Sequence, residues 1–76
     1  MKRYDLRHLG NDFEARLKEL CDELPCGEVA IFLFEVRAFD NVEKATHCAL
    51  ESGLSLVNSL RFNEVDWTLV VKRGNQ

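Results

Sequence analysis

The sequence lacks several features that would point directly to a class of function. It has no apolar run near the ~20 residues that a membrane-spanning helix needs, and its first residues are charged, so we expect neither a membrane span nor a secretory signal. It also has no glycine-rich phosphate loop and no serine–histidine–aspartate order typical of a hydrolase. We therefore predict a protein that is not an enzyme and that needs no cofactor.

Basic charge is scarce as well. Ten Lys and Arg stand against 13 Asp and Glu, which gives a formal net charge of −3. Nucleic acids and anionic membranes are bound through basic surfaces, so this balance argues against a dedicated binder of either. Weak nucleic-acid binding through basic residues gathered near the two ends is the alternative function. The residues that would carry it are Lys2, Arg3, Arg7, Arg61, Lys72 and Arg73.

Cysteine occurs three times, at Cys21, Cys26 and Cys48. An odd number favours free thiols in a reducing cytoplasm, and we expect a cytoplasmic protein. Cys21 and Cys26, followed by His47 and Cys48, resemble a zinc set only loosely. Adjacent helical residues diverge by about 100°, which makes His47 and Cys48 poor co-ligands and a poor nucleophile–base pair. We predict structural thiols and no metal site.

The length of 76 residues is enough for one small domain. A core of this size supplies about 3–5 kcal/mol of net stability, so many such domains depend on disulfides, a metal or a partner chain. The apolar fraction of 46% and charged fraction of 30% indicate a folded protein rather than a disordered one. Residues 1–9 fit either an edge strand or a flexible arm, and residues 73–76 are expected to form a polar tail.

The segment between Asn11 and Leu24 has the apolar period of a helix. Asn11 and Glu14 have the spacing of a capping box, and Pro25 should end the helix, because the residue before a proline avoids the α region. Its inner stripe is Phe13, Leu17, Leu20 and Leu24, with Cys21 at the edge.

Residues 41–52 are expected to form a second helix. Asp40 and Glu43 repeat the capping-box spacing, and Gly53 suits the position just after a helix end. The predicted inner stripe is mostly small and would let the helix lie close to a sheet: Val42, Ala45, Thr46 and Ala49.

Residues 28–36, "EVAIFLFEV", carry apolar side chains on both faces of a strand, which is typical of an interior strand. Residues 54–62 and 67–72 alternate between apolar and polar positions around the turn "NEVD" and predict a hairpin. The expected fold is thus a small α+β open-faced sandwich of order α-β-α-β-β, with an N-terminal strand left open. Its two helices pack on one face of a three- or four-stranded mixed sheet.

This arrangement assigns each strand residue to a face. We expect the helices to cover Phe32, Phe34, Leu54, Leu56, Leu60, Trp67, Leu69 and Val71. The other face would show an apolar centre of Val29, Ile31, Leu33, Val57 and Val70, with a polar rim of Ser55, Ser59, Arg61, Thr68 and Lys72.

A competing arrangement places one helix on each face and leaves nothing uncovered. The one-sided arrangement leaves an apolar centre with a polar rim, which is the general anatomy of an association site. From it we predict a small interaction or regulatory module that binds a protein partner, most simply a second copy of itself, through the five apolar residues of the open face. The sequence names no partner and no process.

Overall fold

The computed structural model of the protein describes residues 1–36 and 40–74. This part of the chain forms two α-helices, four strands and a short 3-10 helix. In chain order these are β1 (Lys2–Asp5), the 3-10 helix η1 (Arg7–Asp12), α1 (Phe13–Glu23), β2 (Val29–Glu35), α2 (Asp40–Glu51), β3 (Leu54–Arg61) and β4 (Asp66–Arg73). The N-terminal residues therefore form an edge strand rather than a flexible arm, and β4 takes in Arg73, which was expected to begin the polar tail.

The four strands of the described residues make one mixed sheet in the order β1-β2-β4-β3. β1 runs parallel to β2, and β4 runs antiparallel to both β2 and β3. β2 and β3 are consequently parallel to each other, as expected for strands joined by a helix, but β4 lies between them. The two edges of the sheet are β1 and β3.

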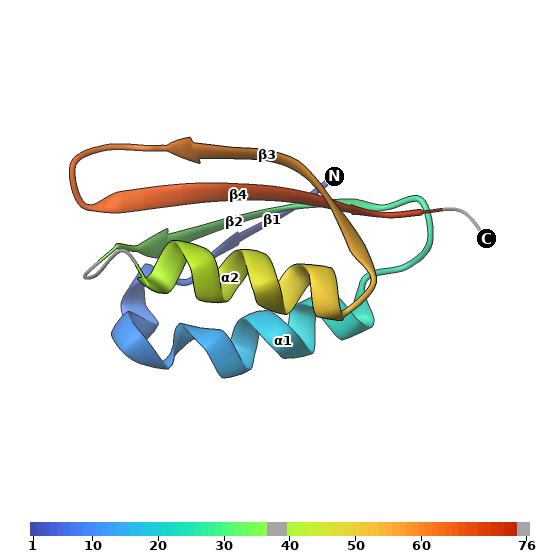
Figure 1. The fold of residues 1–76 in the computed structure, drawn as a ribbon, viewed down its shortest axis with the longest axis horizontal. Helices are drawn as coiled ribbons and strands as arrows, with labels where there is room; N and C mark the ends of the chain where they lie inside the picture. Colours follow the sequence, from blue (N-terminus) through green and yellow to red (C-terminus); the bar gives the residue numbers. More distant parts are fainter. Residues whose placement is uncertain (37–39, 75–76) are drawn as a thin grey trace.

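Both helices pack on the same face of this sheet, and the opposite face carries no helix of the described residues (Figure 1). The buried side chains of β2 are Ala30, Phe32 and Phe34, which alternate with the half-buried residues of the other face. Phe13 of α1 stacks on Phe34 with ring centroids 4.8 Å apart, and Tyr4 of β1 stacks on Phe32 at 5.4 Å. The one-sided sandwich predicted from the sequence is confirmed.

Helix α1 buries the stripe that its sequence predicts. Phe13, Leu17, Leu20, Cys21 and Leu24 are all buried. Leu24 leaves the helical region with ψ of 121°, as a residue before proline should. At the other end Asp12 is the N-cap residue and makes no side-chain cap bond. The side chain of Asn11 lies outside the described part of the protein, so the predicted capping box is not tested.

The end of α1 is closed by a side chain from the far end of the sequence. The Arg73 guanidinium at the end of β4 donates hydrogen bonds to the carbonyl oxygens of Leu24 (2.5 Å) and Cys21 (2.7 Å). Both carbonyls lie at the C-terminal end of α1, where intrahelical donors run out, and the Cys21 oxygen also accepts the Leu24 N–H at 3.3 Å. A cation also suits this end of the helix dipole. Arg73 thereby joins β4 to α1.

Helix α2 lies on the sheet through its small residues, since Ala45 and Ala49 are buried. Gly53 follows its end with φ of 85°, a conformation that favours glycine, and its N–H donates to the Leu50 carbonyl oxygen at 3.0 Å. Asn41 is buried although the sequence pattern did not select it. Its side-chain amide donates to the backbone oxygen of Glu35 at 3.1 Å and so ties α2 to the end of β2.

Candidate functional site

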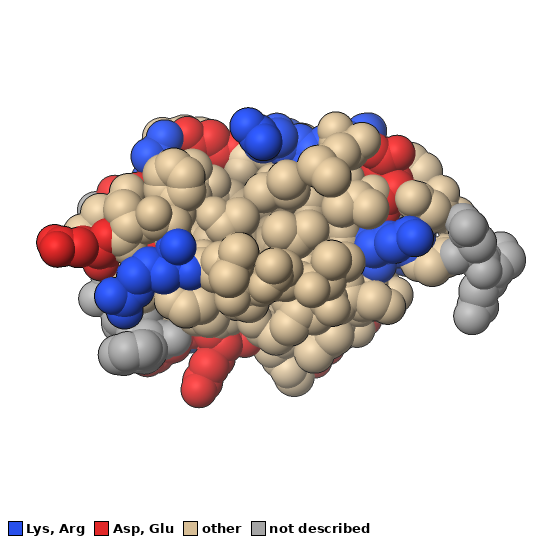
Figure 2. Space-filling model, turned by 90° about the horizontal axis from the view of Figure 1, so that it is seen from above, with Lys and Arg blue, Asp and Glu red and all other residues tan. Residues whose placement is uncertain are grey.

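The sheet face opposite the helices is the main candidate for function. The pairing of β2 with β4 sets Ile31 beside Val70 and Leu33 beside Thr68, all half-buried. Val29 lies at one end of this row, next to Lys72. Seen from this side, the face has a broad uncharged centre with charged residues around its margin (Figure 2). Four of the five predicted centre residues, Val29, Ile31, Leu33 and Val70, thus lie together on this open face.

The outer strand β3 differs from the prediction because it contains a β-bulge. Its register on β4 shifts between Leu56 and Asn58, so that Val57 has no paired residue and is 56% exposed. One extra residue in a strand reverses the faces of the residues that follow. Leu60 pairs with Thr68 of the open face and is 55% exposed, so its predicted place under the helices is wrong.

The same shift moves the expected polar residues to the other side. Ser59 and Arg61 pair with Leu69 and Trp67, which belong to the face that carries the helices. The indole N–H of Trp67 donates to the Ser59 hydroxyl oxygen at 2.7 Å, which places both side chains on one side. Their assignment to the rim of the open face is therefore wrong. Leu56 pairs with Val71 as expected, but it is 43% exposed rather than covered.

A hollow of about 350 Å³ lies on the open face. Ile31, Leu33 and Thr68 line it, together with the strongly exposed ring of Phe62 just beyond β3. Arg3 and Asp5 of β1 stand at its other side. A shallow apolar hollow with charged groups on one edge is suited to the side chain of a protein partner.

Asp5 is engaged by a neighbouring cation. The Arg7 guanidinium donates to both Asp5 carboxylate oxygens, at 2.7 and 3.0 Å, and these bonds lower the pKa of Asp5 from 3.8 to about 2. Arg7 also reaches the buried carboxylate of Asp66 at 3.3 Å. Asp66 in turn accepts a bond from the Asn63 amide at 2.9 Å, so this network ties the β3–β4 turn to the N-terminal part of the protein.

The six basic residues of the alternative function do not form one surface. Two of them are committed elsewhere, since Arg7 binds carboxylates and Arg73 binds the end of α1. Arg61 pairs with a residue of the helix-bearing face, whereas Lys2 and Arg3 belong to β1 and Lys72 to β4. The basic side chains visible on the open face stand apart around its margin rather than in one patch (Figure 2). This distribution gives the nucleic-acid alternative little support.

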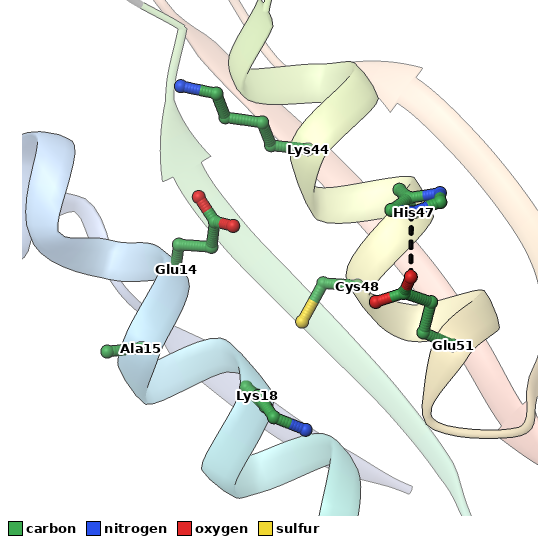
Figure 3. Close-up of a pocket in the computed structure, with 7 residues that line it drawn as sticks. All are labelled: Glu14, Ala15, Lys18, Lys44, His47, Cys48 and Glu51. Atoms are coloured by element: carbon green, nitrogen blue, oxygen red, sulfur yellow. Dashed lines mark ion pairs between the residues drawn. The ribbon is translucent and has the colours of Figure 1, made fainter.

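A second hollow, of about 390 Å³, lies between α1 and α2 and contains two of the residues that drew attention in the sequence. Cys48 directs its sulfur toward the gap between the helices, while His47 lies beside Glu51 on α2 (Figure 3). The His47 ring atom Nε2 and the Glu51 carboxylate atom Oε1 are 2.9 Å apart. His47 and Cys48 therefore diverge, as their adjacency on a helix predicts.

Two of the three thiols, Cys21 and Cys48, have the character of structural groups. Burial raises the pKa of Cys21 to about 12, and burial together with the nearby Glu14 carboxylate raises the pKa of Cys48. Both changes disfavour the reactive thiolate. Cys26 is exposed in the loop after α1. Among residues 1–36 and 40–74, no three His, Cys, Asp or Glu side chains are grouped so that they could hold a metal ion.

Two residues of the open face were missed by sequence reasoning. Leu60 was assigned to the covered side because strict alternation was assumed through residues 54–62, and Phe62 was assigned to neither face. The sequence signal for the bulge is Asn58, which follows Val57. The side-chain oxygen of Asn58 accepts a bond from the Ser59 N–H at 2.9 Å. An asparagine that satisfies a strand N–H in this way competes with ladder pairing and favours an irregularity.

The helices of the described residues are all too short and polar to cross a membrane. The sequence profile of one protein family, the E chain of putative NADH-ubiquinone oxidoreductase, matches residues 1–73. The solution structure of HP1264 from Helicobacter pylori is similar to this protein, with 47% sequence identity and a TM-score of 0.67. That similarity covers 99% of this chain and 100% of the other. No curated protein sequence gives a significant match.

Proposed function

This protein belongs to the family described as the E chain of putative NADH-ubiquinone oxidoreductase, and on that basis we propose that it is a non-catalytic docking subunit of an NADH–quinone oxidoreductase assembly. Its contribution is to bind another subunit of that assembly through the open face of its sheet. The observation that carries the proposal is the uncovered apolar centre of this face, formed by Val29, Ile31, Leu33, Leu60, Phe62 and Val70.

Burial of this centre explains why a small protein keeps it apolar. Each Å² of apolar surface removed from water contributes about 25 cal/mol, although ordering and lost freedom offset much of that on binding. Phe62 and Leu60 are more than half exposed in the isolated protein and would gain most from a partner. Aromatic residues at the centre of an interface are frequent determinants of affinity.

NADH is the reductant that the family description names. A dinucleotide is commonly held by a glycine-rich turn between a strand and a helix. In this sequence the segment between β1 and α1 contains a single glycine, Gly10, and residues 36–39 between β2 and α2 contain no glycine. We therefore assign this protein no part in holding NADH, and its function is proposed to be contact with another subunit. A cytoplasmic location is proposed with it, because the three cysteines are free thiols, as a reducing compartment favours.

The test is recovery of oxidoreductase subunits with the affinity-tagged protein purified from the organism that carries it. Mass spectrometry identifies and quantifies those subunits. We expect the wild-type protein to recover them and Val70→Lys to reduce the recovery by at least about tenfold, because a charge is placed in the apolar centre. His47→Lys places the same residue on the exposed side of α2 and is the matched control, with recovery unchanged.

A second variant guards against loss of folding, since Val70 is half-buried. Phe62→Ser changes a residue that is 60% exposed, and it should keep the melting temperature while also reducing recovery. Recovery of no oxidoreductase subunit with the wild-type protein, or unchanged recovery with both variants, would contradict the proposal. The homodimer expected from the sequence is the competing outcome: a wild-type dimer in light scattering that Val70→Lys dissociates would make the partner a second copy.

A further inference from the structure

Charge is divided unevenly between the two layers of the molecule. The helices α1 and α2 together carry seven Asp and Glu against three Lys and Arg, a net charge of −4. The four strands carry three Asp and Glu against five Lys and Arg, a net charge of +2. The protein is acidic as a whole, yet its sheet layer is basic.

Two cations of the sheet layer stand on the open face beside its apolar centre. Arg3 of β1 pairs with Ile31, and Lys72 of β4 pairs with Val29, so both side chains belong to the open side. With strands ~4.8 Å apart and ~3.3 Å between successive residues, their Cα atoms are roughly 12 Å apart. Both residues are exposed.

The acids near these cations are already engaged by other groups. Asp5 is bound by Arg7, and the Glu28 carboxylate lies 3.1 Å from the N-terminal amino group. Within residues 1–36 and 40–74, Arg3 and Lys72 take part in none of the ion pairs. The open face therefore presents two uncompensated positive charges at the margin of an apolar surface.

We propose that the surface covering the open face belongs to a different protein, apolar at its centre, with carboxylates roughly 12 Å apart at its margin that meet Arg3 and Lys72. This inference rests on the proposed docking function and specifies the chemistry of the partner. Complementary charge at an interface margin steers association and selects the partner.

The same charges disfavour a second copy as the occupant. A symmetric dimer places the same surface on both sides of its interface. Two open faces brought together would gather Arg3 and Lys72 twice, and neither copy brings an unengaged carboxylate from Asp5 or Glu28 to meet them. Like charges facing one another in this way cost binding free energy.

The experiment replaces two basic residues with glutamate, either on the sheet or on the helices. The recovery of oxidoreductase subunits by the tagged protein is measured for each variant. Arg3→Glu/Lys72→Glu should reduce recovery at least about tenfold, as expected for losing a complementary pair of contacts. Lys18→Glu/Lys44→Glu makes the same change of charge on the helical layer and should leave recovery unchanged. Wild-type recovery should also fall as the salt concentration is raised.

The outcomes separate this inference from the docking function. If Val70→Lys abolishes recovery while Arg3→Glu/Lys72→Glu retains it, docking stands and the acidic partner is refuted. If Val70→Lys retains recovery, docking through this face fails and the inference fails with it. Equal losses for the two charge-exchanged pairs would show an effect of total charge alone and would also refute the inference.

Discussion

Replacing Arg73 with Met should destabilise the protein strongly, although the residue lies only three positions from the C-terminus. The variant keeps an unbranched side-chain stem and the backbone pairing of Arg73 with Gly27 and Glu28. It loses two hydrogen bonds from a charged donor, at 2.5 and 2.7 Å, to the last turn of α1. Such bonds contribute about 1.5–3 kcal/mol each, and the partly exposed position of Arg73 favours the lower end.

We therefore expect the free energy of unfolding to fall by about 3 kcal/mol, from two bonds at this lower end, which is more than half of the ~3–5 kcal/mol that a core of this size supplies. For a protein of this length, the melting temperature should fall by about 4–8 °C for each kcal/mol. Urea denaturation followed by circular dichroism measures the change. Lys72→Met is the matched control, because this neighbouring cation makes no ion pair in the described structure, and it should change stability by less than about 0.5 kcal/mol. Equal effects of the two substitutions would refute the role of Arg73 as a cap of α1.

Three further predictions concern the core, the N-terminal ion pairs and the thiols. Phe34→Leu should lower the free energy of unfolding by about 1–2 kcal/mol in urea denaturation, because it removes the stacked ring of Phe13–Phe34, and no change would show that this contact is not part of the core. The pKa of Asp5 is lower in the folded protein than the unfolded value of 3.8, so its stabilising contribution is present above about pH 4 and is lost as the pH falls toward 2. Asp5→Asn should therefore flatten the acid side of a plot of melting temperature against pH. An unaltered plot would contradict the assignment. Iodoacetamide at about pH 8 should modify exposed Cys26 first and buried Cys21 only after unfolding, as followed by mass spectrometry, and equal rates in the folded protein would be inconsistent with the burial of Cys21.

The packing of both helices on one face of the sheet could be predicted from the sequence, because the apolar pattern of each helix and strand is consistent with that arrangement. The stripe of α1 from Phe13 to Leu24 and the small residues Ala45 and Ala49 of α2 each leave one face for a sheet. β2 is apolar on both sides, and two helices on the same face of the sheet cover only one of these sides. The second apolar side of β2 is therefore left uncovered, and it forms the open face centred on Ile31 and Val70.

The position of β4 was beyond a local reading of the sequence. It lies between β2 and β3, where it pairs Phe32 with Leu69 on one side and Leu69 with Ser59 on the other. The alternation of apolar and polar side chains in residues 67–72 fits a strand at the edge of the sheet as well as it fits a strand at the centre. Strand order depends on how the helices connect the strands in space, and no short pattern encodes it.

The faces of β3 were predicted wrongly beyond Leu56 because alternation assumes an unbroken register. The extra residue, Val57, depends on pairing with β4 and on the bond that Asn58 makes to the Ser59 N–H. The error understated the candidate site, since the bulge brings Leu60 to the open face in place of Arg61. Arg73 was likewise unpredictable as a helix cap, because its partners Cys21 and Leu24 lie about fifty positions away in the sequence.

The most direct measurement of the central claim is photo-cross-linking from a benzophenone amino acid placed at Val70, in the middle of the open face, within the organism that carries the protein. We expect cross-links from this position to a subunit of the NADH–quinone oxidoreductase and none from the same amino acid placed at His47 on the exposed side of α2. Cross-links from His47 alone, or from Val70 only to a second copy of the protein, would contradict the account.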